Sequence, residues 1–158
     1  MRRKARNKFG FKQESVRMNR LFLCFALSVL TFPVLAGEAS DVVRTFYDNP
    51  DKALEADNPR ISEPMLSVLK ANAASNEEPC IDFSPVLDAQ DWDEKELKDT
   101  LQLDEKIDGE TALVTAAFEI FGEARSIDWS LTKQADGWTV TDISSKVGEW
   151  TLSKFECK

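Results

Sequence analysis

The sequence predicts an α+β domain in which helices come first and a curved antiparallel sheet of four strands follows. The apolar residues recur every three to four positions between residues 40 and 75, and every second position from about residue 99 onward. Short turn signals, of which Asp108-Gly109 and Asp136-Gly137 are the clearest, separate the alternating segments. A bent sheet packed around helices in this order forms a cone-shaped domain.

Two helices are predicted in the first half of this domain. Ser40 is a suitable cap for the first helix, which Asn49-Pro50 ends. Ser62 is a suitable cap for the second, which has Pro64 in its first turn and ends near residue 75. The predicted buried faces are Val42, Val43, Phe46 and Tyr47 in the first helix, and Ile61, Met65, Leu66, Leu69 and Ala73 in the second.

Four strands joined by short turns are predicted between about residues 99 and 145. A last apolar segment, which contains Trp150, Leu152 and Phe155, is predicted to pack back on the sheet as a helical turn. The residues predicted to face the core from the strands are Leu101, Leu103, Ile107, Ala112, Val114, Ala116, Phe118, Ile120, Ile127, Trp129, Leu131, Trp138 and Val140.

Residues 1–36 are predicted to be a secretory signal peptide. They hold eight Lys and Arg residues but one acidic residue, and they end in the apolar run Leu21–Ala36. The run is short for a bilayer span and ends in V-L-A, which favours cleavage after Ala36 over a membrane anchor. Met18 begins a more typical leader, so the translation start stays open. Residues 37–158 are then a single domain exported to the periplasm.

The charge of the predicted mature chain limits its partners. Residues 37–158 contain 12 basic and 27 acidic residues, a net charge of −15. Such a chain repels the phosphates of nucleic acid and favours a cationic partner. The whole chain lacks histidine, which excludes Ser-His-Asp and Cys-His catalysis and histidine-based zinc sites. We predict no metal and no cofactor.

Cys80 and Cys157 are predicted to form a disulfide. Cys24 would leave with the signal peptide, so the mature chain keeps an even pair in an oxidising compartment. The alternative, a reactive thiol, lacks a histidine base.

Three segments resemble an uncharacterised bacterial envelope family of the nuclear transport factor 2-like superfamily. They are Phe46-Tyr47, the run I-D-F-S-P-V-L-D-A-Q-D-W from Ile81 to Trp92, and G-W-T-V-T-D-I from Gly137 to Ile143. The resemblance covers most of residues 40–155. It implies a secreted, cystatin-like cone without an agreed activity.

The segment Cys80–Glu96 is the main candidate for a functional site, because it contains six carboxylates and two aromatic residues. A calcium loop would need a glycine at its bend, and this segment has none. Two interpretations remain, a structural connection and a binding surface. The candidate binding residues are Asp82, Phe83, Asp88, Asp91, Trp92, Asp93 and Glu94.

As a structural connection, this segment would be anchored to the core by Phe83, Leu87 and Trp92. Asp82 and Asp91 would hold the loop by accepting backbone N–H groups. The remaining carboxylates, which are those of Asp88, Asp93, Glu94 and Glu96, would face water.

The preferred functional interpretation is a non-catalytic periplasmic binding protein whose acidic surface engages a basic envelope protein. One form is an immunity protein or inhibitor of a cell-wall hydrolase. The alternatives are a ligand-binding module and, as the superfamily permits, an isomerase-type enzyme with Asp142 as general base beside Tyr47. In a further alternative, the acidic residues serve only to keep the protein soluble. The sequence names neither the partner nor the oligomeric state.

Overall fold

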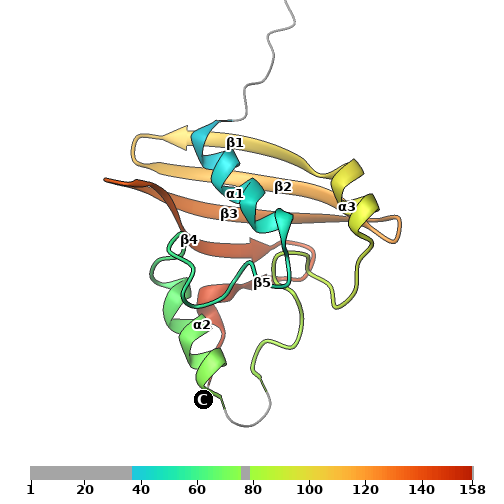
Figure 1. The fold of residues 1–158 in the computed structure, drawn as a ribbon, viewed down its shortest axis with the longest axis horizontal. Coiled ribbons are helices and arrows are strands. Elements are labelled where there is room, and N and C mark those ends of the chain that lie inside the picture. The colour runs from blue at the N-terminus through green and yellow to red at the C-terminus, as the bar shows by residue number, and fades with distance from the viewer. Residues whose placement is uncertain (1–36, 76–78, 158) are drawn as a thin grey trace, which may run out of the picture. The chain divides into compact units, whose positions relative to one another are not determined.

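Three helices lie on one face of a five-stranded antiparallel sheet within the described part of the chain (Figure 1). The computed structural model describes residues 37–75 and 79–157, so the predicted signal peptide lies outside the described residues. The sheet has the order β1-β2-β3-β4-β5 and is not closed. The elements are α1 (Glu38–Asp48), α2 (Met65–Ala74), α3 (Glu94–Thr100), β1 (Gln102–Asp108), β2 (Thr111–Ile120), β3 (Glu123–Gln134), β4 (Gly137–Ser145), β5 (Trp150–Thr151) and the 3₁₀ turn η1 (Leu152–Lys154).

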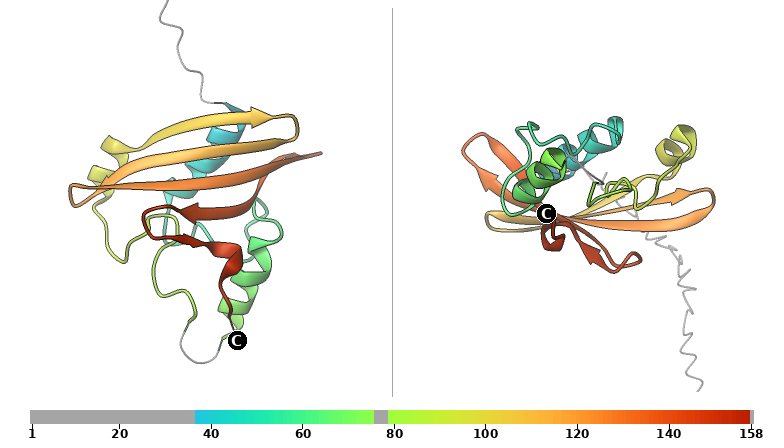
Figure 2. Two further views of the ribbon diagram at one scale, coloured as in Figure 1. Left: turned by 180° about the vertical axis from the view of Figure 1, so that it is seen from behind. Right: turned by 90° about the horizontal axis from the view of Figure 1, so that it is seen from below.

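This arrangement confirms the predicted α+β class and its four long strands. The structure adds α3 and the two-residue strand β5. The sequence E-K-E-L-K-D-T of α3 has a single apolar residue, Leu97, so it carries no helical periodicity. Figure 2 shows all three helices on the same side of the sheet. In its described residues, the chain has no helix long and apolar enough to cross a membrane.

The core lies between the helices and the sheet, and large aromatic side chains pack among its aliphatic residues. Every second residue of β2 is buried, as predicted, and so are Trp129 and Trp138. The rings of Phe46 and Trp129 have centroids 4.9 Å apart. Tyr47 is 4% exposed, and its hydroxyl accepts a hydrogen bond of 3.1 Å from the indole nitrogen of Trp129. Burial strongly raises the pKa of Tyr47, against the smaller effect of this hydrogen bond.

Both predicted helices occur, but their starts differ from the prediction. Ile61 is buried outside α2, because it forms a parallel bridge with Val140 of β4. The bridge uses hydrogen bonds from Ser62 N to Val140 O (2.8 Å) and from Val140 N to Arg60 O (2.7 Å). Helix α2 therefore begins at Met65. Ala73, which was expected on the buried face, is exposed.

Helix α1 begins at Glu38 and is capped by a residue from β1. Ser40, the predicted cap, lies inside the helix. Its backbone N–H and its hydroxyl both donate to Oε2 of Glu105, at 2.7 and 3.0 Å. A carboxylate at a helix N-terminus satisfies free N–H groups and interacts favourably with the helix dipole. Glu105 thus caps α1, a role that was predicted for the Ser40 side chain.

Replacing Glu105 by alanine is expected to lower the free energy of unfolding by about 1–2 kcal/mol, because two hydrogen bonds at the start of α1 are lost. The matched control is Asp104→Ala, on the neighbouring exposed position of the same strand. Urea denaturation should give a lower midpoint for the Glu105 variant and a shift within about 0.5 kcal/mol for the control. Equal midpoints for the two variants would contradict the assigned cap.

Candidate functional site: an acidic loop beside an apolar cleft

The segment between α2 and α3 crosses the molecule as an anchored loop. Val86 and Leu87 are completely buried, and Ser84 forms a short antiparallel bridge with Ala89. The Ser84 N–H donates to the Ala89 carbonyl at 2.9 Å. The prediction that Leu87 anchors this segment is confirmed, whereas Phe83 and Trp92 are half-buried. The loop therefore holds a defined shape and does not merely span two elements.

Asp88 fastens this loop to the β4–β5 hairpin. Its φ of 52° lies in the left-handed region, which Asp tolerates better than most residues. Its carboxylate accepts from the Ser145 hydroxyl at 2.7 Å and from the Trp150 indole nitrogen at 2.8 Å. The expectation that Asp88 faces water is wrong, because both of its oxygens have partners inside the molecule.

A disulfide and an aromatic cluster attach the same loop to the chain's C-terminal segment. Cys80 and Cys157 are bonded, with their Cα atoms 5.3 Å apart, as predicted from the cysteine count. The predicted helical turn is η1, which precedes Cys157. The ring of Phe83 lies 5.5 Å from that of Trp150 and 6.2 Å from that of Phe155, between centroids. These contacts fix the start of the loop.

The other acidic residues of the segment divide into two groups. Asp93 caps α3 by accepting the Glu96 N–H at 2.8 Å, and Glu94 pairs with Lys98 at 2.5 Å. This hydrogen bond raises the pKa of Lys98. By contrast, the carboxylates of Asp82 and Asp91 make no hydrogen bond to any other described residue. The expectation that these two hold the loop is wrong, and their charges are exposed to solvent.

Glu96 was predicted to face water, but its carboxylate is hydrogen-bonded to the backbone of another segment. Its two carboxylate oxygens accept the backbone N–H groups of Phe121 and Gly122 at 2.6 and 2.8 Å. They thereby brace the β2–β3 turn. The carboxylates of Asp88 and Glu96 therefore have the structural role that was expected of Asp82 and Asp91.

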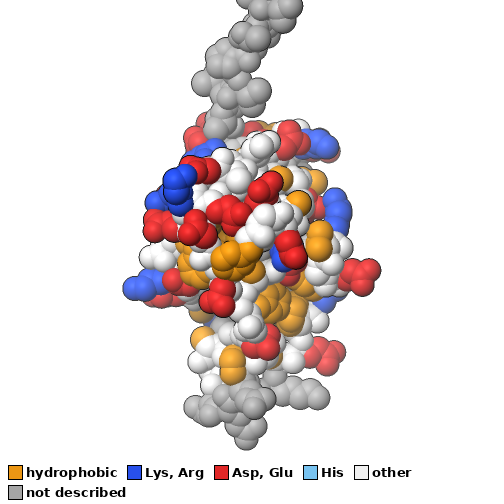
Figure 3. All heavy atoms as spheres, turned by 90° about the vertical axis from the view of Figure 1, so that its right-hand side faces the viewer, with side chains coloured by type: hydrophobic (Ala, Val, Ile, Leu, Met, Phe, Trp, Pro, Cys, Tyr) orange, Lys and Arg blue, Asp and Glu red, His pale blue; other side chains and the backbone are white. Residues whose placement is uncertain are grey.

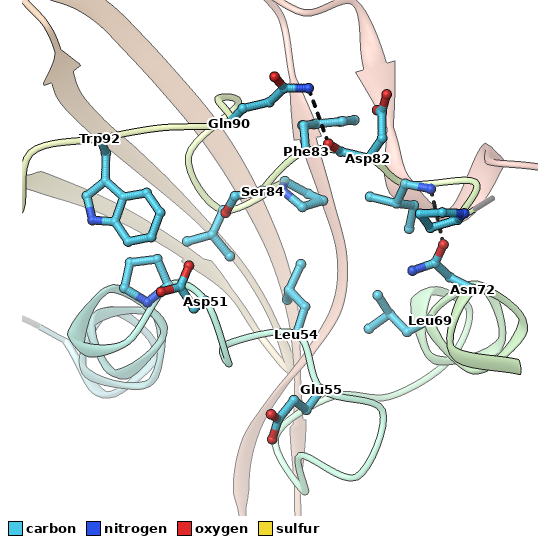
Figure 4. Close-up of a pocket in the computed structure, with 15 residues that line it drawn as sticks. Asp51, Leu54, Glu55, Leu69, Asn72, Asp82, Phe83, Ser84, Gln90 and Trp92 are labelled. Carbon is cyan, nitrogen blue, oxygen red and sulfur yellow. Dashed lines mark hydrogen bonds between the residues drawn. The ribbon is translucent and has the colours of Figure 1, made fainter. Parts of the chain in front are cut away.

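A cleft of about 560 Å³ opens beside the loop, and we name it the Trp92 cleft. Its walls are the turn that follows α1, one side of α2 and the loop itself (Figure 4). Trp92 and Asp51 lie together at one end, and Leu54 and Leu69 line the middle and far parts (Figure 4). Ser84 also lines the cleft, and its buried hydroxyl has no hydrogen-bond partner among the described residues.

A second hollow of about 370 Å³ lies beside the Trp92 cleft. The two share Pro50, Asp51 and Trp92, and the second extends to Glu94 and Lys98. Figure 3 shows the face of the molecule on the α3 side, where hydrophobic side chains are surrounded by Asp and Glu. The surface around the loop thus combines apolar area with negative charge, which is typical of a recognition surface for a cationic partner.

In the structure, Asp142 does not lie beside Tyr47 as the enzyme alternative requires. A register shift between Ser130 and Leu131 leaves Thr141 as an extra residue in β4, so Asp142 pairs with exposed Ser130. Asp142 therefore lies on the open face of the sheet, opposite to buried Tyr47. Its carboxylate accepts from the backbone and hydroxyl of Ser153 at 3.1 and 2.5 Å. The predicted pairing of Asp142 with Tyr47 in an interior pocket does not occur.

The open face of the sheet carries a polar cluster around Asp128. Its carboxylate accepts from the Thr115 hydroxyl at 2.8 Å and pairs with Lys146 at 2.9 Å. Burial raises the pKa of Asp128, but the hydrogen bonds from Lys146 and Thr115 lower it overall. Within the residues that the structure describes, no group of three or more Cys, Asp or Glu side chains is placed to hold a metal ion.

Sequence reasoning missed the residues that complete the cleft from outside the loop. Asp51 and Leu54 come from the turn after α1, and Leu69 and Asn72 from α2. The amide oxygen of Asn72 accepts the Ile81 N–H at 3.1 Å, which ties α2 to the loop. The sequence has one local signal in this region, Asn49-Pro50, which correctly predicted the end of α1. It carried no information about which segment the following turn would contact.

Together these features define a class: a small acidic α+β domain with a filled core, a disulfide-fastened loop and a surface cleft. No family model matches the sequence, and no curated protein matches it. The resemblance to one particular envelope family is therefore not supported by a family match.

Among solved structures, the fold is similar to the type VI immunity protein Tai3 in the native effector–immunity complex Tae3–Tai3 from Ralstonia pickettii. The TM-score is 0.50 at 15% identity, and the match covers 66% of this chain and 91% of that chain. The selenomethionine form of that complex gives a TM-score of 0.50 at 15% identity, over 70% of this chain and 97% of that chain. At such identity the similarity shows a shared fold.

Proposed function

We propose that this protein is a periplasmic, non-catalytic immunity protein that binds and neutralises a basic cell-wall hydrolase. The observation that carries the proposal is the fold shared with Tai3, which spans 91% of that chain. In the solved structure, Tai3 is part of an effector–immunity complex with Tae3. Fold alone does not transfer a function, so the proposal also depends on the surface of this chain.

The charge of the domain supports a basic partner. Residues 37–158 carry a net charge of −15. Enzymes that act on anionic polymers are commonly cationic, and an acidic inhibitor is steered toward them by long-range attraction. The Cys80–Cys157 disulfide suits an oxidising compartment, which agrees with export through the predicted signal peptide.

The proposed contact surface is the acidic loop with its cleft. Asp82, Asp91 and Glu94 supply exposed charge, and half-buried Phe83 and Trp92 supply apolar anchors. Asp93 lies on the same surface and caps α3. Asp88, also a candidate from the sequence, has a positioning role in this proposal because its carboxylate is already engaged.

The test is a pull-down from envelope extract with the mature domain, at low and at high salt. We expect capture of a basic protein whose hydrolysis of peptidoglycan is abolished by stoichiometric addition of the domain. Reversing Asp82, Asp91 and Glu94 to Lys together should weaken binding by about 100-fold or more, because attraction becomes repulsion. Binding should also weaken as salt is added.

The matched control reverses Asp104, Asp108 and Glu110, which are exposed around the β1–β2 hairpin and change the net charge equally. This control should lower the association rate but keep most of the affinity, since these residues lie outside the proposed contact. Circular dichroism must show that both variants are folded. Capture of no envelope protein, or equal binding by the two triple variants, would refute the proposal.

A further inference from the structure

The Trp92 cleft brings an indole ring and a carboxylate together at one end. One wall carries the half-buried indole ring of Trp92. Asp51 lies at the same end of the cleft (Figure 4), and both residues also line the second hollow. The buried hydroxyl of Ser84 points to no partner among the described residues.

We infer that the Trp92 cleft binds an arginine side chain that projects from the basic partner. This inference rests on the proposed function and names the chemical group that the site recognises. A planar guanidinium stacks on an indole face and forms charge-assisted hydrogen bonds with a carboxylate. Trp92 supplies the face and Asp51 the carboxylate.

The apolar lining favours arginine over a free cation. Leu54 lines the middle of the cleft and Leu69 its far part, so a long side chain that enters the cleft contacts apolar groups along its methylenes. Arginine is also preferred to lysine, because an ammonium group is more strongly hydrated and lacks a planar face. A volume of about 560 Å³ accommodates the side chain together with adjoining main chain of the partner.

The experiment uses the mature domain with ¹⁵N-labelled tryptophan and the tripeptide acetyl-Gly-Arg-Gly-amide as probe. The Trp92 indole resonance is assigned as the one that disappears in Trp92→Phe. We expect this resonance to shift in a saturable manner, with the resonances of buried Trp129 and Trp138 unchanged. The same peptide with citrulline, which keeps the shape but lacks the charge, should bind at least about tenfold more weakly, and the lysine peptide should also bind more weakly.

Asp51→Asn should weaken binding of the arginine peptide by about tenfold, because the charge-assisted pair is lost. The matched control is Glu55→Gln, which removes the same charge from a residue whose carboxylate points away from Trp92 and Asp51 (Figure 4). It should stay within about twofold of the unchanged domain. An unshifted Trp92 resonance, or equal binding of arginine and citrulline peptides, would overturn the inference.

The two proposals fail in different ways. Saturable arginine binding without any captured envelope protein would support the arginine site and refute the proposed function. Capture of a basic hydrolase whose affinity is the same for Asp51→Asn and Glu55→Gln would support the function and refute the arginine site.

Discussion

Removing the Cys80–Cys157 disulfide is expected to lower the free energy of unfolding by about 4 kcal/mol. The bond joins residues 77 positions apart, so it closes a long loop and strongly restricts the unfolded chain. It also holds the start of the acidic loop against the C-terminal segment, where Phe83 contacts Trp150 and Phe155.

The measurement is urea denaturation of the double variant Cys80→Ser, Cys157→Ser beside the unchanged mature domain. Adding a reductant should shift the unchanged domain toward the variant and leave the variant itself unaffected. The buried core should survive, because the C-terminal end of the chain, next to Cys157, lies away from β1 and β2 (Figure 1). If the denaturation midpoint stayed the same after the substitution and after addition of the reductant, the bond would contribute nothing to stability.

Replacing Asp88 by alanine should have the second largest effect, a loss of about 2–4 kcal/mol in the free energy of unfolding. The change leaves the Trp150 indole N–H and the Ser145 hydroxyl without their acceptor in a half-buried site. It also places alanine at a φ of 52°, which costs about a further 1 kcal/mol for a residue with a Cβ and no polar group. The loop would lose its attachment to the β4–β5 hairpin.

Two variants separate these contributions when they are measured by urea denaturation. Asp88→Asn keeps the tolerance for positive φ and one acceptor oxygen, so its loss should be about half as large. Asp91→Ala removes an equal charge three residues further on and should stay within about 0.5 kcal/mol, because its carboxylate is exposed and makes no described hydrogen bond. If Asp88→Ala were as stable as Asp91→Ala, the two hydrogen bonds would not hold the loop.

The contrast between Asp88 and Asp91 illustrates how far the site was predictable. The sequence correctly marked the loop as acidic, aromatic and anchored at Leu87. It assigned the structural carboxylates wrongly, because nothing local distinguishes Asp88 from Asp82 or Asp91. The partners of Asp88 are Ser145 and Trp150, which lie 57 and 62 positions away. Such pairings follow from how elements pack, and composition does not reveal them.

Asp142 likewise shows that a local pattern does not determine the partners of a polar side chain, even within a strand. Alternation placed it in phase with Trp138 and Val140, which are both buried as predicted. One extra residue at the register shift reverses the side of every later residue, because successive strand residues face opposite sides. The Asp142 carboxylate consequently supports Ser153 at η1.

The sequence by itself determined the α+β class, the buried alternation of β2 and β3, and the cysteine pair, because periodicity and composition report burial and redox setting directly. Only the tertiary structure decided which carboxylates are structural and which stay exposed. It also brought Asp51 from the turn after α1 to Trp92 of the acidic loop. The physical reason is that hydrophobic burial follows a local pattern, whereas a polar partnership or a cleft depends on segments that meet only when the chain has packed.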